Sequence, residues 1–175
     1  MDRRNILLEY LYIFPVISKK YPRTQRFLLI NFDETNFALQ NREMDCWQQT
    51  AVYVRRGQHT AFFCPEFPNE EKIEKNGIHA FSTHGHLYSV NRTRMKLAEK
   101  ATALGCEFAF YGHTHVAKYE NIGGVHVINP GSISQSRSRV EETYAELLIN
   151  EEDQSAKLNF RNRNHDIIDS ETFSI

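Results

Sequence analysis

Two pairs of histidines, His84/His86 and His113/His115, carry the clearest chemical signal in this sequence. Residues two apart on a strand project to the same side, so an H-x-H at a strand end can direct two imidazoles at one point. Neutral imidazole is a good ligand for manganese, iron, zinc and nickel. A glycine inside or immediately before each pair leaves room for the backbone to approach a ligand. The two pairs therefore predict metal ligands.

Three other histidines, His79, His126 and His165, are isolated in the sequence. A single histidine is more often hydrogen-bonded or solvated than bound to a metal, and we expect that of these three.

Each H-x-H pair follows a predicted strand. Apolar runs and alternation predict strands over residues 27–32, 50–55, 78–83, 107–111, 124–129, 143–150 and 155–161. A helix is predicted over 92–104, with Gly105 as its C-terminal cap. Asp33, Gln58 and Asn129 also come just after predicted strands, which is where open α/β sheets place their active sites.

The first segment with a clear pattern is 5–17. The spacing of its apolar residues fits one face of a helix. Glu9 and Pro15 interrupt the apolar run, which argues against a signal peptide, and the run is too short to span a bilayer. We therefore expect a core-facing helix over 5–17, and a loop over 60–72, where two prolines occur.

The composition is typical of one packed domain. The chain has 175 residues, of which 41% are hydrophobic and 12% aromatic, and its net charge is −1. We expect a single α/β domain over 1–175, with no membrane segment and no charge pattern for nucleic acid. Cys46, Cys64 and Cys106 form no CxxC motif, which favours reduced thiols in a cytoplasmic protein.

Three stretches make the sequence recognisable: Thr83-His84-Gly85-His86-Leu87-Tyr88, Gly112-His113-Thr114-His115-Val116 and Asn129-Pro130-Gly131-Ser132-Ile133-Ser134. In this order they resemble successive signatures of the calcineurin-like metallophosphoesterases. The resemblance is closest to the small bacterial manganese-dependent phosphodiesterases, which share their fold with the small scaffold subunit of the retromer. It is strong over 50–160 and weaker before that.

The resemblance implies an α/β sandwich with two metals, most simply Mn²⁺, that hydrolyses a small phosphodiester. It assigns His84 and His113 to one metal, His115 to the other and Asp33 to a bridge between them. Two such metals hold a hydroxide and clamp the phosphate for in-line attack.

The resemblance implies other roles less directly. Gln58 stands where the family has a metal-binding asparagine. His86 lies where a side chain can contact a phosphate oxygen. Asn129 lies on a turn that lines the site.

The sequence departs from the family at its start, where the first strand and its Asp-x-His motif are absent. One metal position keeps Asp33, His84 and His113, and the other keeps Asp33 and His115. We therefore expect one metal site and a second that is weak or empty. A missing central strand would open the core, so we expect a chain that starts late or whose first third was altered by a reading-frame slip.

Three functions stay open at this point. The first is a metal-dependent phosphodiesterase impaired by the missing ligands. The second is a catalytically silent protein-binding module on the same fold, and the third is a non-functional truncated fragment.

Overall fold

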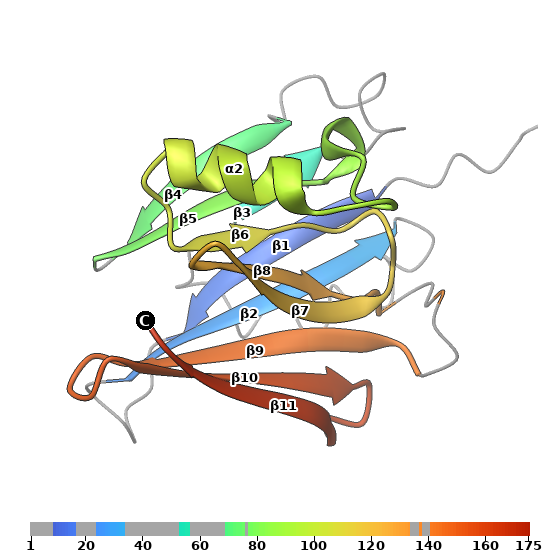
Figure 1. Cartoon of the computed structure of the whole chain (residues 1–175). Coiled ribbons are helices and arrows are strands. Elements are labelled where there is room, and N and C mark those ends of the chain that lie inside the picture. The colour runs from blue at the N-terminus through green and yellow to red at the C-terminus, as the bar shows by residue number, and fades with distance from the viewer. Residues whose placement is uncertain are drawn as a thin grey trace, which may run out of the picture.

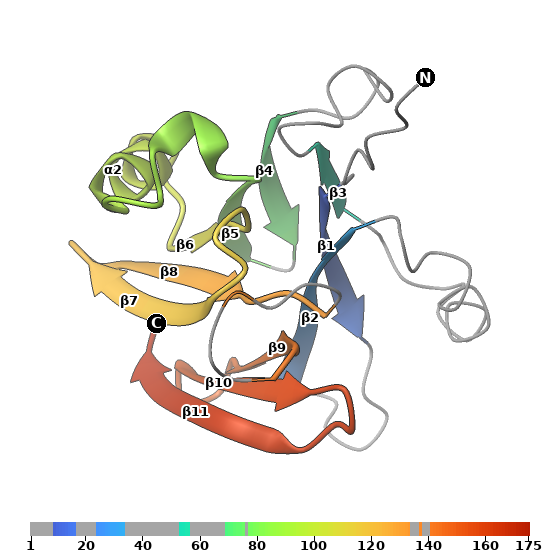
Figure 2. The ribbon, with the colours of Figure 1, turned by 90° about the vertical axis from the view of Figure 1, so that its right-hand side faces the viewer.

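The computed structural model describes residues 9–16, 24–33, 53–56, 69–75, 77–133, 137 and 141–175. These residues form two β-sheets that face one another, with the helix α2 (Met95–Ala103) on the outer face of one of them (Figures 1 and 2). This arrangement is the mixed α/β sandwich that the resemblance implied. No helix in these ranges is long and apolar enough to cross a membrane.

The five-stranded sheet carries both histidine pairs. Its order is β4 (Glu70–Lys75), β5 (Ile78–Thr83), β6 (Phe108–Phe110), β8 (Val125–Pro130) and β7 (Ala117–Ile122). The three central strands are parallel, and the two edge strands are antiparallel to their neighbours. Strands covered on both faces have continuous apolar sequences, which explains why the central three were predictable from sequence.

The six-stranded sheet faces it and is antiparallel throughout. Its order is β11 (Ile167–Ser174), β10 (Ser155–Asn162), β9 (Thr143–Asn150), β2 (Thr24–Asp33), β1 (Glu9–Val16) and β3 (Tyr53–Arg56). The predicted hairpin of 143–150 and 155–161 is confirmed, since β9 and β10 pair across a turn at 151–154.

The prediction of a helix over 5–17 is wrong, because residues 9–16 form the strand β1. Aromatic and β-branched residues follow one another in this segment and favour a strand. Pro15 also disfavours a helix interior. In the sheet, β3 pairs only with residues Tyr10–Ile13 of β1, so Pro15 has a strand neighbour on one side only.

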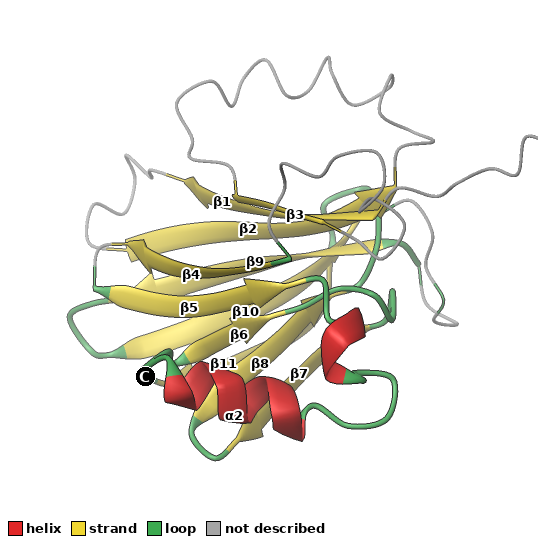
Figure 3. Cartoon of the chain, turned by 90° about the horizontal axis from the view of Figure 1, so that it is seen from above, coloured by secondary structure: helices red, strands yellow, loops and turns green. Residues whose placement is uncertain are grey.

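The main core lies between the two sheets. Leu29, Leu147 and Leu158 from one sheet pack with Phe108 and Ile128 from the other, and all are fully buried. A second cluster joins the outer face of the five-stranded sheet to α2, which lies along that face in Figure 3. Since the first cluster draws on both sheets, the sandwich holds the histidine-bearing strands rigidly.

The helix ends as predicted. Gly105 has a φ of +66°, and the N–H groups of Gly105 and Cys106 donate to the carbonyls of Thr102 and Ala101. This is a left-handed C-terminal cap, for which glycine is the favoured residue.

Three edge strands were missed or only partly predicted. β4 begins at Glu70, inside the range predicted as a loop, and β7 and β11 were not predicted. All three are rich in charged residues and partly exposed, as edge strands usually are, so they lack an apolar run. The pair Gly123-Gly124, with φ of +61° and +89°, is a hairpin turn signal that could have identified β7.

Candidate functional site

The site is built from the loops that follow β5 and β6. These strands are parallel neighbours, with Ser82 opposite Phe110, so their carboxyl ends meet at one edge of the sheet. Beyond the strands, the N–H of Gly112 donates to the carbonyl oxygen of His84 at 3.0 Å. This hydrogen bond keeps the two loops side by side and brings His84 next to His113.

Three of the predicted histidines meet here. Nε2 of His84 lies 3.1 Å from Nδ1 of His113, and the ring centroids are 5.1 Å apart. The ring of His86 lies 5.4 Å from that of His84 and 6.4 Å from that of His113. His84 is fully buried, whereas His86 and His113 are half-buried. The cluster thus has one deep ring and two that are reachable from solvent.

His113 and His115 have unusual backbones, with φ of +66° and +59°. A non-glycine residue in this region costs on the order of 1–3 kcal/mol and persists only where its surroundings enforce it. The loop is correspondingly tight, with the N–H of Thr114 donating to the carbonyl of Gly112 at 2.7 Å. His115, the second histidine of its pair, is 1% exposed and therefore points into the protein interior.

Hydrogen bonds from the side chain of Asn129 hold this loop in place. Its amide nitrogen donates to the carbonyl of Gly112 at 2.8 Å and to Oγ1 of Thr114 at 2.9 Å. Its Oδ1 accepts from the N–H of Gly131 at 2.9 Å. The side chain is fully buried at the end of β8, so these hydrogen bonds are strong by exclusion of water. Asn129 therefore braces the histidine loop, whatever else it contacts.

Gly131 and Thr143 complete the brace. Oγ1 of Thr143 donates to the carbonyl of Pro130 at 2.8 Å. Gly131 has a φ of +82°, and a Cβ placed there would collide with Oγ1 of Thr143. Only glycine fits this turn, which explains the Pro-Gly pair in physical terms. Thr143 was not identified from the sequence, because nothing in its local pattern marks it.

The remaining predicted ligands are placed less fully. Asp33 is the last residue of β2, and its side chain lies outside the described residues. Gln58, with its neighbour His59, also lies outside them, as do Cys46 and Cys64. Within the described residues, no group of three or more His, Cys, Asp or Glu side chains is arranged to hold a metal ion. The ligand assignments therefore stay predictions.

The facing nitrogens nevertheless fit one metal. Two nitrogen ligands at about 2.0–2.1 Å from a tetrahedral metal lie roughly 3.3–3.4 Å apart. The 3.1 Å between Nε2 of His84 and Nδ1 of His113 is a hydrogen-bond distance and lies within a few tenths of an ångström of that spacing. Imidazole pairs of this kind suit first-row divalent metals. A metal at this point would take these two nitrogens as ligands, and a carboxylate such as Asp33 is the chemically expected third member.

A tyrosine beside the cluster is kept neutral. Tyr111 follows β6 directly and is 2% exposed, and burial raises its pKa to about 12. Its hydroxyl therefore does not add a negative charge to the site at neutral pH.

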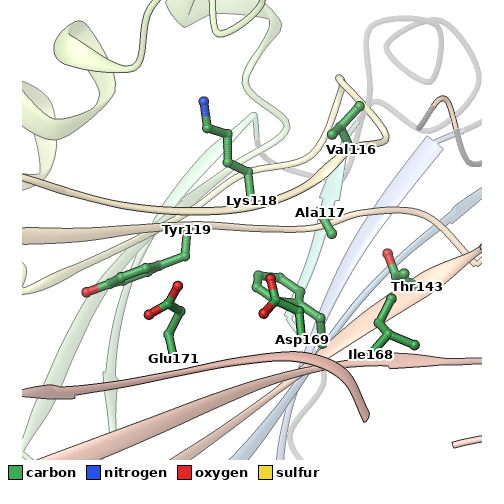
Figure 4. Close-up of a pocket in the computed structure, with 9 residues that line it drawn as sticks. Val116, Ala117, Lys118, Tyr119, Thr143, Ile168, Asp169 and Glu171 are labelled. Atoms are coloured by element: carbon green, nitrogen blue, oxygen red, sulfur yellow. The ribbon is translucent and has the colours of Figure 1, made fainter. Parts of the chain in front are cut away.

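A separate cavity of about 390 Å³ opens between β7 and the strands β10 and β11 (Figure 4). It is lined by Ala117, Tyr119, Asp169 and Glu171 among others, and none of the four H-x-H histidines lines it. Two of its lining residues neighbour the site: Val116 follows His115 in the sequence, and Thr143 donates to the carbonyl of Pro130. The histidine cluster is therefore at a different place from this cavity.

The comparison with known families agrees with the mixed α/β fold and identifies the family. The model of the calcineurin-like phosphoesterase superfamily domain matches residues 31–152. Since this match covers more than half of the chain, the chain belongs to the calcineurin-like phosphoesterase superfamily.

Individual relatives are similar over part of their length. The chain is 34% identical to the probable metallophosphoesterase YsnB of Bacillus subtilis over 87 residues, which cover 50% of this chain and 52% of YsnB. A solved structure from Streptococcus pneumoniae, described as a conserved uncharacterized protein and predicted phosphoesterase, aligns with 33% identity and a TM-score of 0.58. That alignment covers 62% of this chain and 63% of the other.

A third match shows the fold alone. Vacuolar Protein Sorting 29 from Cryptosporidium parvum is 17% identical with a TM-score of 0.53, over 62% of this chain and 58% of that protein. The chain spans about half the length of the curated relatives it matches.

Proposed function

We propose that this chain is a metal-dependent phosphoesterase that hydrolyses small phosphodiesters with a metal-activated water, and that Mn²⁺ is the metal. The observation that carries the proposal is the 3.1 Å separation of His84 Nε2 and His113 Nδ1 at the ends of adjacent parallel strands. Membership of the calcineurin-like phosphoesterase superfamily supplies the reaction class.

In this proposal His84 and His113 hold the metal from β5 and β6, and Asp33 adds a carboxylate from the end of β2. When bound, the metal lowers the pKa of a water and neutralises charge on the phosphate. Asp33 and His115 provide for a second, weaker metal, and Gln58 stands where the family has the asparagine that completes a metal shell. Because His84 is fully buried and braced through its backbone by Gly112, its ring is preorganised for binding.

The half-buried His86 has a different task. Its ring stands 5.4 Å from that of His84 and is reachable from solvent. We assign it to a non-bridging oxygen of the phosphodiester, which it holds by a hydrogen bond. Asn129 acts on the same site by fixing the loop that carries His113 and His115.

We also propose that residues 1–175 work as one domain, since the main core joins both sheets. A cytoplasmic location fits the buried free thiol of Cys106, which a reducing compartment keeps unmodified.

The test is Mn²⁺-dependent hydrolysis of bis-p-nitrophenyl phosphate by the full chain. We expect turnover that requires Mn²⁺, is removed by a chelator and returns when Mn²⁺ is added back. His113→Ala should lower the rate about 10²–10³-fold, the usual effect of removing one element of transition-state stabilisation. His165→Ala is the matched control, because His165 is exposed and bonds only to Tyr144 among the contacts at its ring nitrogens.

A folded wild-type chain without turnover would contradict the enzyme and favour the silent binding module. Equal loss of rate in both variants would show that the activity does not come from the histidine cluster.

A further inference from the structure

The cavity between β7 and β11 carries negative charge from two residues of β11. Asp169 and Glu171 both line it, and both are exposed. They lie two residues apart on the strand, so their side chains project to the same side. In the pairing with β10, Asp169 lies opposite Phe160 and Glu171 opposite Leu158, and these two partners belong to the main core. The two carboxylates therefore face β7 across the cavity, as Figure 4 shows.

The lysine in the lining does not neutralise these carboxylates. Nζ of Lys118 lies 3.3 Å from Oε1 of Glu120, and in Figure 4 it points away from Asp169 and Glu171. Burial and the charge of Glu171 both raise the pKa of Tyr119, so the negative potential of β11 extends across the cavity to β7. A cation that enters the cavity would be attracted by this potential.

The rest of the lining suits a guanidinium or ammonium group on a long side chain. The rings of Tyr119 and Phe160 and the apolar Val116 line the cavity beside the carboxylates. An arginine can stack its plane on an aromatic ring and donate two parallel hydrogen bonds to a carboxylate. Oδ1 of Asp169 already accepts from the N–H of Ser170 at 2.9 Å, which limits the rotation of this carboxylate before a ligand binds. At about 390 Å³, the cavity has room for side chains but is at the small end of ligand pockets.

Strand β11 is also an open edge of the six-stranded sheet. Among the described strands it pairs only with β10, so the backbone groups on its other side are not used in the sheet. Such an edge is a template for one more strand. Side chains on the inward face of an added strand would lie beside Asp169 and Glu171, because directly paired residues of neighbouring strands project to the same face. The edge and the cavity therefore form one continuous surface.

The charge of this surface decides which strand fits. If a second copy of β11 paired with it in an antiparallel register, Asp169 and Glu171 would meet the same carboxylates of the copy. Like charges opposite each other destabilise a sheet, and charged residues on an edge commonly protect against self-association. A strand with two basic side chains two residues apart would instead place an opposite charge beside each carboxylate. Charge complementarity thus favours a basic partner over a second copy of this chain.

We propose that the free edge of β11 and the adjoining cavity bind an extended basic segment of a partner protein, in which two cationic side chains two residues apart pair with Asp169 and Glu171. The backbone of the segment adds a strand to the six-stranded sheet, and its side chains supply the specificity. The proposal concerns a different place from the histidine cluster and does not depend on the proposed function.

The probe is the synthetic peptide Ser-Val-Arg-Val-Arg-Val-Ser, acetylated and amidated, titrated into the ¹⁵N-labelled full chain. We expect saturable shifts of backbone amides in β11 and β7, and an affinity that falls as salt is added. Two control peptides have the same charge. Ser-Val-Val-Arg-Arg-Val-Ser directs its arginines to opposite faces, and the probe with methylated arginine and valine nitrogens cannot add a strand. Each control should bind about tenfold more weakly, the equivalent of one or two hydrogen bonds.

Variants of the chain test the two carboxylates. We expect Asp169→Asn and Glu171→Gln each to weaken binding of the probe about two- to fivefold, the usual range for an exposed ion pair, and the double variant about five- to twentyfold. Both substitutions keep the size of an exposed side chain, so the fold should be preserved. Glu99→Gln, which removes the same charge from an exposed position on α2, is the control and should leave the affinity unchanged.

Three results would overturn the proposal. The first is no binding up to about 1 mM peptide, or shifts that lie away from β7 and β11. The second is equal affinity for the probe and either control peptide, or for wild type and the double variant, since charge alone would then explain the attraction. The third concerns the second copy: we expect a monomer in sedimentation velocity without peptide, and a dimer that the peptide dissociates would assign the edge of β11 to self-association instead.

Discussion

The five-stranded sheet holds two groups of histidine contacts that differ in what surrounds the ring. At the carboxyl ends of β5 and β6, His84, His86 and His113 face one another across loops, with ring centroids 5.1–6.4 Å apart. Inside β8, His126 is instead stacked on Phe173 of β11, with ring centroids 4.1 Å apart and planes within 20°. In the first group, the rings of His86 and His113 are half-buried and reachable from solvent. In the second group, aromatic side chains cover the ring of His126.

The second group links the two sheets. Nδ1 of His126 lies 3.0 Å from the hydroxyl of Tyr119 on β7, while Phe173 comes from the opposite sheet. His126 is 5% exposed, and burial lowers its pKa, so the neutral ring is favoured. This stack joins the last strand of the six-stranded sheet to the edge of the five-stranded one.

The comparison teaches that strand position decides what a histidine does in this fold. Within a strand the neighbouring strands surround the ring and use it for packing. Beyond the strand end the backbone is free to turn, as the positive φ of His113 and His115 shows, and imidazoles can converge.

The sharpest way to break this comparison is to remove one ring from each group. We expect His84→Ala to lower the rate of bis-p-nitrophenyl phosphate hydrolysis about 10²–10³-fold, because it removes a ligand. We expect His126→Ala to leave the rate within a few-fold of wild type but to destabilise the protein by about 2–3 kcal/mol, through a cavity and lost stacking. Steady-state rates and urea unfolding measure both effects.

A rate loss of the same size in His84→Ala and His126→Ala would contradict this difference between the two groups. It would mean that the two groups act as one unit.

The brace behind the histidine loop allows a second test. Gly131→Ala should cost about 3 kcal/mol or more of unfolding free energy, since a positive φ and a collision with Thr143 act together. Gly124→Ala is the matched control: its φ is also positive, at +89°, but a Cβ there meets nothing within 4 Å. It should cost only about 1–2 kcal/mol. Similar losses of stability in the two variants would show that the Pro-Gly turn has room to adjust.

The buried ring of His126 makes a third prediction, on pH. Its folded-state pKa is lowered, so the unfolded chain binds a proton more readily. The stabilisation is complete above the ordinary histidine pKa of about 6.5 and is lost as the pH falls from there through the folded-state pKa. A hydrogen bond with the backbone of Ser174 and the charge of Glu107 oppose this lowering of the pKa of His126 by favouring the charged ring.

The variant for this prediction is His126→Phe, which keeps a ring in the stack but cannot titrate. Urea unfolding at a series of pH values should show a smaller loss of stability on acidification for His126→Phe than for wild type. His165→Gln, which changes an exposed histidine, should follow the wild type. Parallel pH curves for wild type and His126→Phe would contradict the assignment.

Sequence patterns predicted the strands that lie in the interior. β5, β6, β8 and β9 are continuous or alternating apolar runs that neighbouring elements cover, and their sequences reflect this. The edges were harder, because β4, β7 and β11 have exposed charged residues and are strands only through pairing with a neighbour. The helix prediction for 5–17 was wrong for a related reason, because the apolar residues of this segment fit one face of a helix as well as a strand.

The residues of the site also divide into those that the sequence predicted and those that it did not. His84 and His113 were predictable, since a glycine and a strand end mark each pair. Thr143 was not, because its role arises from a hydrogen bond to Pro130, 13 positions away in the sequence. The hydrogen-bonded state expected for His126 and His165 is found, with tyrosine hydroxyls as partners.

The smallest predicted effect concerns β7, the edge strand beside His126. Tyr119 contacts His126, while the next residue, Glu120, pairs with Arg94 at the start of α2. The Arg94 and Glu120 side chains are 18% and 27% exposed, so Glu120→Gln should cost about 1 kcal/mol. Glu142→Gln, which weakens the 3.6 Å pair with the exposed Arg163, should cost less than about 0.3 kcal/mol.

Because Glu120 pairs with Arg94 and not with the aromatic stack, Glu120→Gln should leave the pH dependence of stability as in wild type. A changed pH dependence would mean that β7 transmits the substitution from Glu120 to His126.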